Sequence, residues 1–341
     1  MKRLDVSNPD SRFQSRSVEY FDRQPTHLEL FHDESRSIVS KNDSPDLDFR
    51  YSVNPYRGCM HGCAYCYARP SHESLDFGAG TDFERKIVLK RNAAHLLRRF
   101  FQAPSWRGEP IVFSGNTDCY QPIEATEKLT LDCLRVCEEY RNPVFIITKS
   151  SLIERDIKLL GSLAQLTGLG VAISIPFWDA RMARAIEPYA PTPQRRIATI
   201  ERLRSAGIHV TVAVAPVIPG LADDQLVDIL RAAAGAGAQR AFTTYLRLPR
   251  AVREVFFQCL QEYAPDRVAK VKARVREAQG PSGSHPRFGV RMEGQGPYAQ
   301  AVRSLFQNTA RELGLETAGN KFWRGFRRPE PLPTQLQLFG R

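Results

Sequence analysis

The sequence predicts an α/β fold built from parallel strands that are joined by helices. From about Asp48 onward, short apolar runs rich in β-branched residues alternate with amphipathic segments of helical period. These units recur at roughly 30 residues, which is the spacing of a right-handed β–α–β crossover. The composition, with 42% hydrophobic and 25% charged residues, is that of a globular protein. The spacing alone fits both a barrel and a doubly wound sheet, and in either one ligands bind at the carboxyl ends of the strands.

The first half of the repeat contains three predicted strands, at residues 49–53, 111–113 and 144–147. A long loop and a helix from about Asn92 follow the first strand. The second strand leads to a helix over residues 126–140, and we expect Thr126 to cap its first turn. The third leads to a helix over residues 151–166 that is stopped by Gly168.

The second half contains three more predicted strands, at residues 171–175, 210–214 and 241–246. The helix after the fourth strand spans residues 193–206, with Pro193 at its start and Gly207 just past its end, as is typical of helices. The helix after the fifth strand has Asp223 and Asp224 in its first turn, where the helix dipole favours carboxylates. No Gly-x-Gly-x-x-Gly follows the first strand, so dinucleotide binding of the Rossmann type is unsupported.

The chain divides into four predicted regions. Residues 1–45 are polar and lack periodicity, which predicts a mobile N-terminal arm. The βα repeat covers residues 46–250, and a helical extension, with its last helix near residues 299–313, covers residues 251–320. Residues 321–341 form a basic tail whose prolines predict an extended spacer.

Charge and cysteine content indicate the compartment and the class of partner. The N-terminus lacks the apolar stretch of a secretory signal, and no run of about 18 apolar residues predicts a membrane span. Seven cysteines favour a reduced compartment, so we expect a cytoplasmic protein without membrane contact.

The net charge is +11, and residues 240–341 alone hold 18 Lys and Arg against 8 Asp and Glu. This basic part either follows a polyanion such as nucleic acid or is a solvated basic face.

Cys59, Cys63 and Cys66 form a C-x3-C-x2-C pattern in the loop after the first strand, where a ligand site is expected. Three thiolates at this spacing can bind one metal centre, and iron–sulfur clusters are held by cysteine thiolates. A structural zinc ion would need a fourth ligand, for which His61 and His72 are the nearby residues. Core packing of the thiols is the remaining alternative.

The cysteine pattern on a βα-repeat chain resembles the radical S-adenosylmethionine (SAM) superfamily. Over about residues 48–315 the chain is most similar to a spore photoproduct lyase-like branch. Further motifs carry this resemblance: Tyr65 and Tyr67 beside Cys66, Lys90-Arg-Asn92-Ala, Ile147-Thr-Lys149-Ser, Glu187-Pro188 with Arg196, and Ala213-Val-Ala215-Pro216. The resemblance implies a partial (β/α)6 TIM-like barrel, with a [4Fe-4S] cluster on Cys59, Cys63 and Cys66. It also implies SAM as cofactor, and an electron donor such as flavodoxin or ferredoxin.

The resemblance further implies roles in SAM binding. Lys149 is similar to the strand-3 lysine that contacts the SAM carboxylate, a charge-assisted bond, although it can also be a surface lysine. Thr117 and Asp118 lie in the segment expected to bind the amino group, although the family's usual Gly-Gly-Glu is absent, and a simple turn is the competitor. Ser174 matches a ribose-contacting position, and residues 216–220, beginning at Pro216, border the adenine.

Four further side chains lie in or beside these motifs, and three of them have two open interpretations each. Tyr65 is expected to shield the adenine, while Tyr67 is either part of the site or core packing. Arg196 either contacts SAM or forms an ion pair with Glu187 that ties the loop to its helix. Cys119, next to Asp118, is either the hydrogen-atom donor to a product radical or a small buried hydrophobe.

Three other cysteines are interpreted as core residues. Cys133 and Cys137 lie four residues apart in an apolar helical stripe, a spacing that can bind metal but is more typical of packing. Cys259 lies on another apolar helix face.

The end of the chain holds two further motifs. Gln335, Leu336, Leu338 and Phe339 resemble the Q-L-x-L-F peptide with which bacterial DNA-processing enzymes bind the replication sliding clamp, and the alternative is that they pack back onto the domain. Upstream, aromatic and cationic residues interleave, and they either bind nucleic acid or attach the tail to the barrel. These residues are Lys321, Phe322, Trp323, Arg324, Phe326, Arg327 and Arg328.

The sequence therefore predicts a radical SAM enzyme that cleaves SAM reductively and acts on DNA, in lesion repair or base modification. A second hypothesis keeps the cofactors and moves the target to tRNA, a peptide or a metabolite. A third, of another class, is a non-catalytic iron–sulfur module that binds nucleic acid or the clamp. The sequence identifies neither the substrate nor the hydrogen donor.

Overall fold

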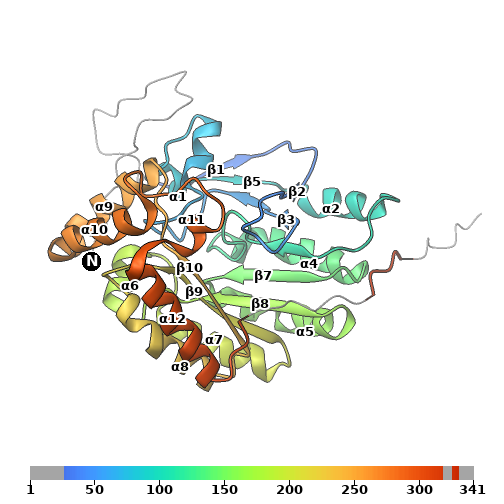
Figure 1. Ribbon diagram of the computed structural model, residues 1–341. Helices are drawn as coiled ribbons and strands as arrows, with labels where there is room; N and C mark the ends of the chain where they lie inside the picture. The colour runs from blue at the N-terminus through green and yellow to red at the C-terminus, as the bar shows by residue number, and fades with distance from the viewer. Residues whose placement is uncertain (1–26, 318–324, 330–341) are drawn as a thin grey trace, which may run out of the picture.

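The central element is an open seven-stranded sheet in which six strands run parallel. In the computed structural model, which describes residues 27–317 and 325–329, the strands follow the order β10-β9-β8-β7-β6-β3-β2. The parallel strands are β3 (Tyr51–Val53), β6 (Ile111–Phe113), β7 (Val144–Thr148), β8 (Leu169–Ser174), β9 (His209–Val217) and β10 (Arg240–Tyr245). These are the six strands expected from the repeat. The fold is therefore the predicted partial (β/α)6 barrel, curved but left open between its edge strands (Figure 1).

Side chains alternate between the two faces of this sheet, which places one set inside the barrel and the other under the helices. Val112, Phe145 and Ala172 form a small inner cluster. Their neighbours, such as Phe113 and Ile146, belong to the main core between sheet and helices. The helices of the repeat are α2 (Ala93–Gln102), α4 (Leu129–Glu139), α5 (Ile157–Leu166), α7 (Pro193–Ser205) and α8 (Leu226–Gly235), and α12 (Gly296–Glu312) packs beside α8.

The ends of these helices test the expected caps. The side chain of Thr192 accepts a hydrogen bond from the backbone N–H of Arg195, and Pro193 takes the first position of α7, as predicted. The prediction for Thr126 is wrong, because a short helix α3 (Glu124–Glu127) contains it and its hydroxyl donates to the Ile123 carbonyl at 3.0 Å. Lys128, with φ 56°, separates α3 from α4. Short 3-10 turns, η2 (Ser151–Asp156) and η3 (Asp223–Gln225), precede α5 and α8.

A second sheet, which the sequence did not indicate, lies beside the barrel. It contains β1 (Glu29–His32), β5 (Lys86–Leu89) and β4 (Tyr56–Arg57), with β1 parallel and β4 antiparallel to β5. β2 (Val39–Lys41) pairs with β3 and extends the main sheet. The expectation of a mobile arm is therefore wrong for residues 29–32 and 39–41, because the first segment pairs with the distant strand β5 and the second with the nearby strand β3. Residues 1–26 lie outside the described part of the chain.

The C-terminal helices cover the loop that carries the cysteines. α9 (Ala251–Tyr263) packs against α6 (Ala180–Ile186) and against the 3-10 helix η1 (Arg69–Leu75), which follows the cysteines. The turn η4 (Pro265–Arg267) connects α9 to α10 (Val268–Gln279). Their side chains share one hydrophobic cluster with Cys63 and Tyr65. Two short helices, α1 (Asp82–Arg85) and α11 (Val290–Glu293), complete the fold. Within the described residues, no helix has the length and apolar character needed to span a membrane.

Residues 325–329 dock at the opposite end of the barrel from the cysteines (Figure 1). The ring of Phe326 packs on Phe101, with centroids 6.1 Å apart, and Arg328 donates to three backbone carbonyls, of Phe101, Ala103 and Trp106. A side chain at Gly108 would collide with Phe326, because a Cβ there would lie 2.1 Å from the Phe326 Cβ. Phe326 and Arg328 thus attach this segment to the barrel. Lys321, Phe322, Trp323, Arg324 and the clamp-like peptide lie outside the described residues.

Candidate active site

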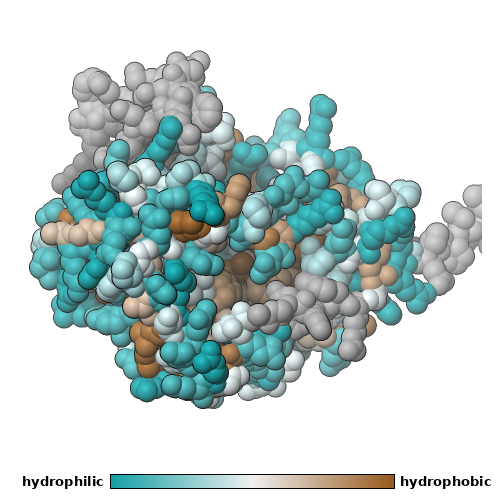
Figure 2. Space-filling model, viewed as in Figure 1, coloured by the Kyte–Doolittle hydropathy of each residue, from teal (hydrophilic) through white to brown (hydrophobic). Residues whose placement is uncertain are grey.

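A cavity of about 300 Å³ lies at the carboxyl ends of the parallel strands, as the fold class predicts. All three motif cysteines line it, together with six of the other predicted site residues: Tyr65, Thr117, Asp118, Lys149, Ser174 and Pro216. Figure 2 shows a hollow in this face of the molecule near the end of β7, with hydrophobic surface inside it and mostly hydrophilic residues around it. The structure thus brings residues from five strand ends and from the cysteine loop to one place.

The cysteine loop is held in shape mainly by Arg69, which sequence reasoning missed. Its side chain is fully buried and donates to the carbonyls of Gly62 and Cys63, both at 3.0 Å, and to those of Ala79 and Gly80. The carboxylate of Glu84, 2.6 Å away, balances its charge. Nothing in the local sequence distinguishes this arginine from the others, because its partners are backbone carbonyls.

The three thiols are free and shielded from water, although Cys66 is only partly buried. Burial and the nearby Glu187 carboxylate raise the pKa of Cys63 to about 12, and burial with the charge of Asp118 holds the pKa of Cys59 well above its usual value. The thiols therefore stay protonated until a metal centre supplies compensating positive charge.

The donor set fits a cluster better than a single zinc ion. Within residues 27–317 and 325–329, no group of three or more His, Cys, Asp and Glu side chains is placed to hold one metal ion. Zinc needs all its ligand atoms within about 2.3 Å of one point, whereas each cysteine of a [4Fe-4S] cluster binds a different iron. His72 faces away, with Nε2 2.9 Å from the Lys86 carbonyl, and burial lowers its pKa to about 4.

Lys149 supplies the positive charge on the cavity wall. Its Nζ lies 3.1 Å from the Ser174 hydroxyl and 3.9 Å from a carboxylate oxygen of Glu187. Burial by itself would lower the pKa of Lys149, but the Cys63 thiol and Glu187 outweigh it and the pKa is raised. The ammonium group is therefore charged and faces the cavity, as binding a carboxylate requires, and its role in SAM binding stays a prediction.

Asp118 accepts hydrogen bonds and lies beside a histidine. The Thr148 hydroxyl and the Lys149 backbone N–H donate to it at 2.7 and 2.8 Å, and His61 Nε2 lies 3.3 Å away. Burial would raise the pKa of Asp118, but His61 and these hydrogen bonds lower it to about 2. The carboxylate thus fixes the start of the Lys149 segment, and the neighbouring Thr117 donates to the Tyr56 carbonyl at 3.1 Å.

One buried carboxylate, that of Glu187, binds both Arg196 and Tyr65. The Arg196 side chain, 1% exposed, lies behind the cavity wall and donates to Glu187 at 2.5 Å and to the Ser174 carbonyl at 2.9 Å. The expectation that Arg196 contacts SAM is therefore not supported, and the ion pair is its role. The Tyr65 hydroxyl also donates to Glu187, which turns the ring of Tyr65 along the cavity wall.

Of the two interpretations of Cys119, the structure favours the small buried hydrophobe over the hydrogen-atom donor. Cys119 is 1% exposed, belongs to the main core and does not line the cavity. Its backbone N–H is held by the Ser114 hydroxyl and its carbonyl by the Thr130 hydroxyl, which turns the side chain inward. Cys133 and Cys137 lie in the same core, and Cys259 packs under α6, as expected.

Tyr67, in contrast, belongs to the cavity mouth and not to the core. Its side chain is 46% exposed, and its hydroxyl donates to the Gly115 carbonyl at 2.6 Å.

An open βα barrel with three cysteines at the carboxyl ends of its strands is the arrangement of an iron–sulfur enzyme. The chain belongs to the radical SAM superfamily, whose family model matches residues 53–233. It is an enzyme, and its cofactors are a [4Fe-4S] cluster and SAM.

Relatives and solved structures agree with this assignment. An uncharacterized protein of Mycobacterium tuberculosis is 40% identical over 232 residues, which are 67% of this chain and 68% of the relative. A radical SAM Nalpha-GlyT isomerase of Pseudomonas phage M6 is 24% identical over 273 residues, 78% of this chain and 52% of the relative. The structure of spore photoproduct lyase complexed with dinucleoside spore photoproduct has a TM-score of 0.57 at 15% identity, covering 84% of this chain and 81% of the other. This last likeness concerns the fold.

Proposed function

We propose that this radical SAM enzyme acts on DNA, abstracting a hydrogen atom from a nucleotide in the course of repair or base modification. Cys59, Cys63 and Cys66 would hold the cluster, which together with SAM would supply the 5′-deoxyadenosyl radical as the acceptor of that hydrogen atom. The chain's own residues bind, orient and exclude water: Lys149 faces the carboxylate, and the apolar inner wall encloses the reacting atoms.

One observation carries the choice of DNA: residues of the basic C-terminal part, Arg247 and Met292, form one wall of the SAM cavity. A basic segment at the mouth of a site attracts a polyanionic substrate. Two comparisons support the proposal, because the phage relative is named for an Nalpha-GlyT isomerase and the similar fold binds a dinucleoside photoproduct.

The test begins with anaerobic reconstitution using iron and sulfide, followed by dithionite and SAM. We expect 5′-deoxyadenosine, more of it with ultraviolet-irradiated or unmodified DNA, and none from Cys63→Ala. Stimulation by tRNA, a peptide or a metabolite in place of DNA would move the function to the second hypothesis. No SAM cleavage by the reconstituted wild type would refute the proposal altogether.

Two partners extend the proposal. A flavodoxin or ferredoxin supplies the electron in the cytoplasm, the reduced compartment that suits the free cysteines. The peptide with Gln335, Leu336, Leu338 and Phe339 docks on the bacterial sliding clamp, since extended Leu and Phe side chains fill an apolar pocket. We expect the full chain to bind the clamp and a Leu338→Ala/Phe339→Ala variant not to; equal binding by both would remove the clamp from the proposal.

A further inference from the structure

Two pairs of one arginine and one aromatic ring lie in or beside the cavity. Tyr67 and Arg247 line it, and Arg291 with Phe288 lies beside it, next to the lining residue Met292 and close enough for its charge to act on Arg247. The Arg247 guanidinium lies 5.1 Å from the centre of the Tyr67 ring, and that of Arg291 lies 4.3 Å from the Phe288 ring. Both rings are exposed, Tyr67 at 46% and Phe288 at 52%. Exposed apolar side chains that gather beside a cavity are typical of a binding surface.

The two arginines differ in how their charge is balanced. Arg291 forms an ion pair with Asp46 and donates to the Ser44 hydroxyl at 3.1 Å. The Arg247 side chain, in contrast, forms no hydrogen bond and no ion pair within the described part of the chain, and it lies over the Tyr67 ring. The Asp46 carboxylate acts on Arg247 only from a distance, while Arg291 binds it directly, so Arg247 is the arginine of the cavity wall that is left to bind a ligand.

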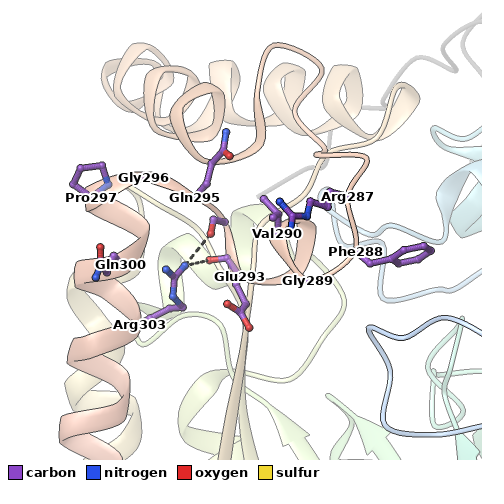
Figure 3. Close-up of a pocket in the computed structure, with 11 residues that line it drawn as sticks. Arg287, Phe288, Gly289, Val290, Glu293, Gln295, Gly296, Pro297, Gln300 and Arg303 are labelled. Atoms are coloured by element: carbon purple, nitrogen blue, oxygen red, sulfur yellow. Dashed lines mark hydrogen bonds between the residues drawn. The ribbon is translucent and has the colours of Figure 1, made fainter.

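The rings are held in place before any ligand arrives. The Tyr67 hydroxyl is fixed by the Gly115 carbonyl. Figure 3 shows Phe288 at the edge of a second surface depression, with its ring pointing away from α12, while Arg303 donates to the carbonyls of Glu293 and Gly294 at 2.8 Å each. The Gly289 backbone N–H is bound by Asp46, which fixes the chain directly after Phe288.

We propose that Tyr67, Arg247, Phe288 and Arg291 form a lip of the cavity that binds a short unstacked segment of single-stranded DNA, with Arg247 binding a phosphate and with Tyr67 and Phe288 each stacking on a base. The inference rests on the proposed function and names the residues that recognise its substrate. Fixed aromatic rings and an arginine are the elements with which proteins hold single strands. A base inside a duplex cannot enter a recessed cavity without leaving the stack.

The experiment measures the affinity of the cluster-loaded protein for a fluorescein-labelled 12-nucleotide single strand of mixed sequence, over a range of salt concentrations. We expect Arg247→Gln to bind about tenfold more weakly and to lower the salt slope by about 0.7, the value for one lost phosphate contact on a single strand. Phe288→Ala is expected to bind about tenfold more weakly with an unchanged salt slope, since stacking carries no charge. The control is Arg231→Gln on the exposed face of α8, which removes the same charge away from the mouth and should bind as the wild type does.

The outcomes distinguish the assignment of the lip from the proposed function. Equal binding by wild type and Arg247→Gln, or an equal loss in Arg231→Gln, overturns the assignment of the lip. Tighter binding of duplex than of single strand also overturns it. A wild type that binds the single strand and shows the Arg247 effect but never cleaves SAM refutes the proposed function and leaves the lip standing. The cluster absorbance and the thermal midpoint of each variant show that it is folded and loaded.

Discussion

The buried Glu187–Arg196 pair allows a quantitative test of the role assigned to Arg196. Replacing Arg196 by leucine removes hydrogen bonds to Glu187, to the Ser174 carbonyl and to the Pro191 carbonyl, the last at 2.9 Å. Both side chains are at most 1% exposed, so water cannot replace the lost partners. Breaking a buried pair from one side costs about 3–5 kcal/mol, against at most about 1 kcal/mol for an exposed pair. Because Lys149 lies 3.9 Å from Glu187 and compensates in part, we expect about 3 kcal/mol.

Urea unfolding of the cluster-loaded wild type and variants measures this loss. A double-mutant cycle adds Glu187→Leu and the combined variant, in which neither member of this ion pair is left without the other. We expect the combined variant to be about 2 kcal/mol more stable than the sum of the single losses predicts. A loss below about 1 kcal/mol for Arg196→Leu, or strictly additive losses, would refute the ion-pair role and return Arg196 to SAM binding.

Three further predictions follow from the same structure. Cys119→Ala should keep full substrate turnover, because its thiol lies in the core, and product analysis that shows a stalled radical would contradict this. The Glu154 carboxylate accepts hydrogen bonds from Arg195, Thr199 and Arg202. Burial alone would raise the pKa of Glu154, but these hydrogen bonds lower it below 4.5. Ionised Glu154 therefore stabilises the fold above pH 4.5, and this stabilisation is progressively lost as the pH falls below that value. The thermal midpoint of Glu154→Gln should therefore lie below that of the wild type at pH 7 and approach it near pH 3. Phe326→Ala should cost about 2 kcal/mol in urea unfolding, and no loss would mean that the tail is not attached through this ring.

The strands of the barrel could be predicted because burial dictates their composition. All six residues of β8 are buried, and a strand buried on both faces reads as a continuous apolar run. β1 has alternating partial burial and a single partner strand, β5, so its pairing depends on a contact that no local pattern reveals. The same limit applies to β2.

Some residues of the site could be predicted from local sequence patterns, and others could not. The cysteine spacing and Lys149 are local patterns, and both reach the cavity. Cys119 follows Asp118 directly, yet the two side chains diverge, one into the core and the other to the cavity wall. Arg69 binds backbone carbonyls and Arg247 lies over the ring of Tyr67. Folding brings these partners together, so the sequence around each arginine does not indicate its role.

The open sheet has a consequence for how the two flanks of the barrel can move. β2 and β10 are the edge strands of the main sheet, and no strand pair joins them among the described residues. The two flanks are linked instead by Asp46 and Ser44 on one side and by Arg291 and the Gly289 backbone N–H on the other. These contacts can break and re-form without disrupting a strand pair, so the flank that carries α11 can shift relative to β2 while the sheet stays intact.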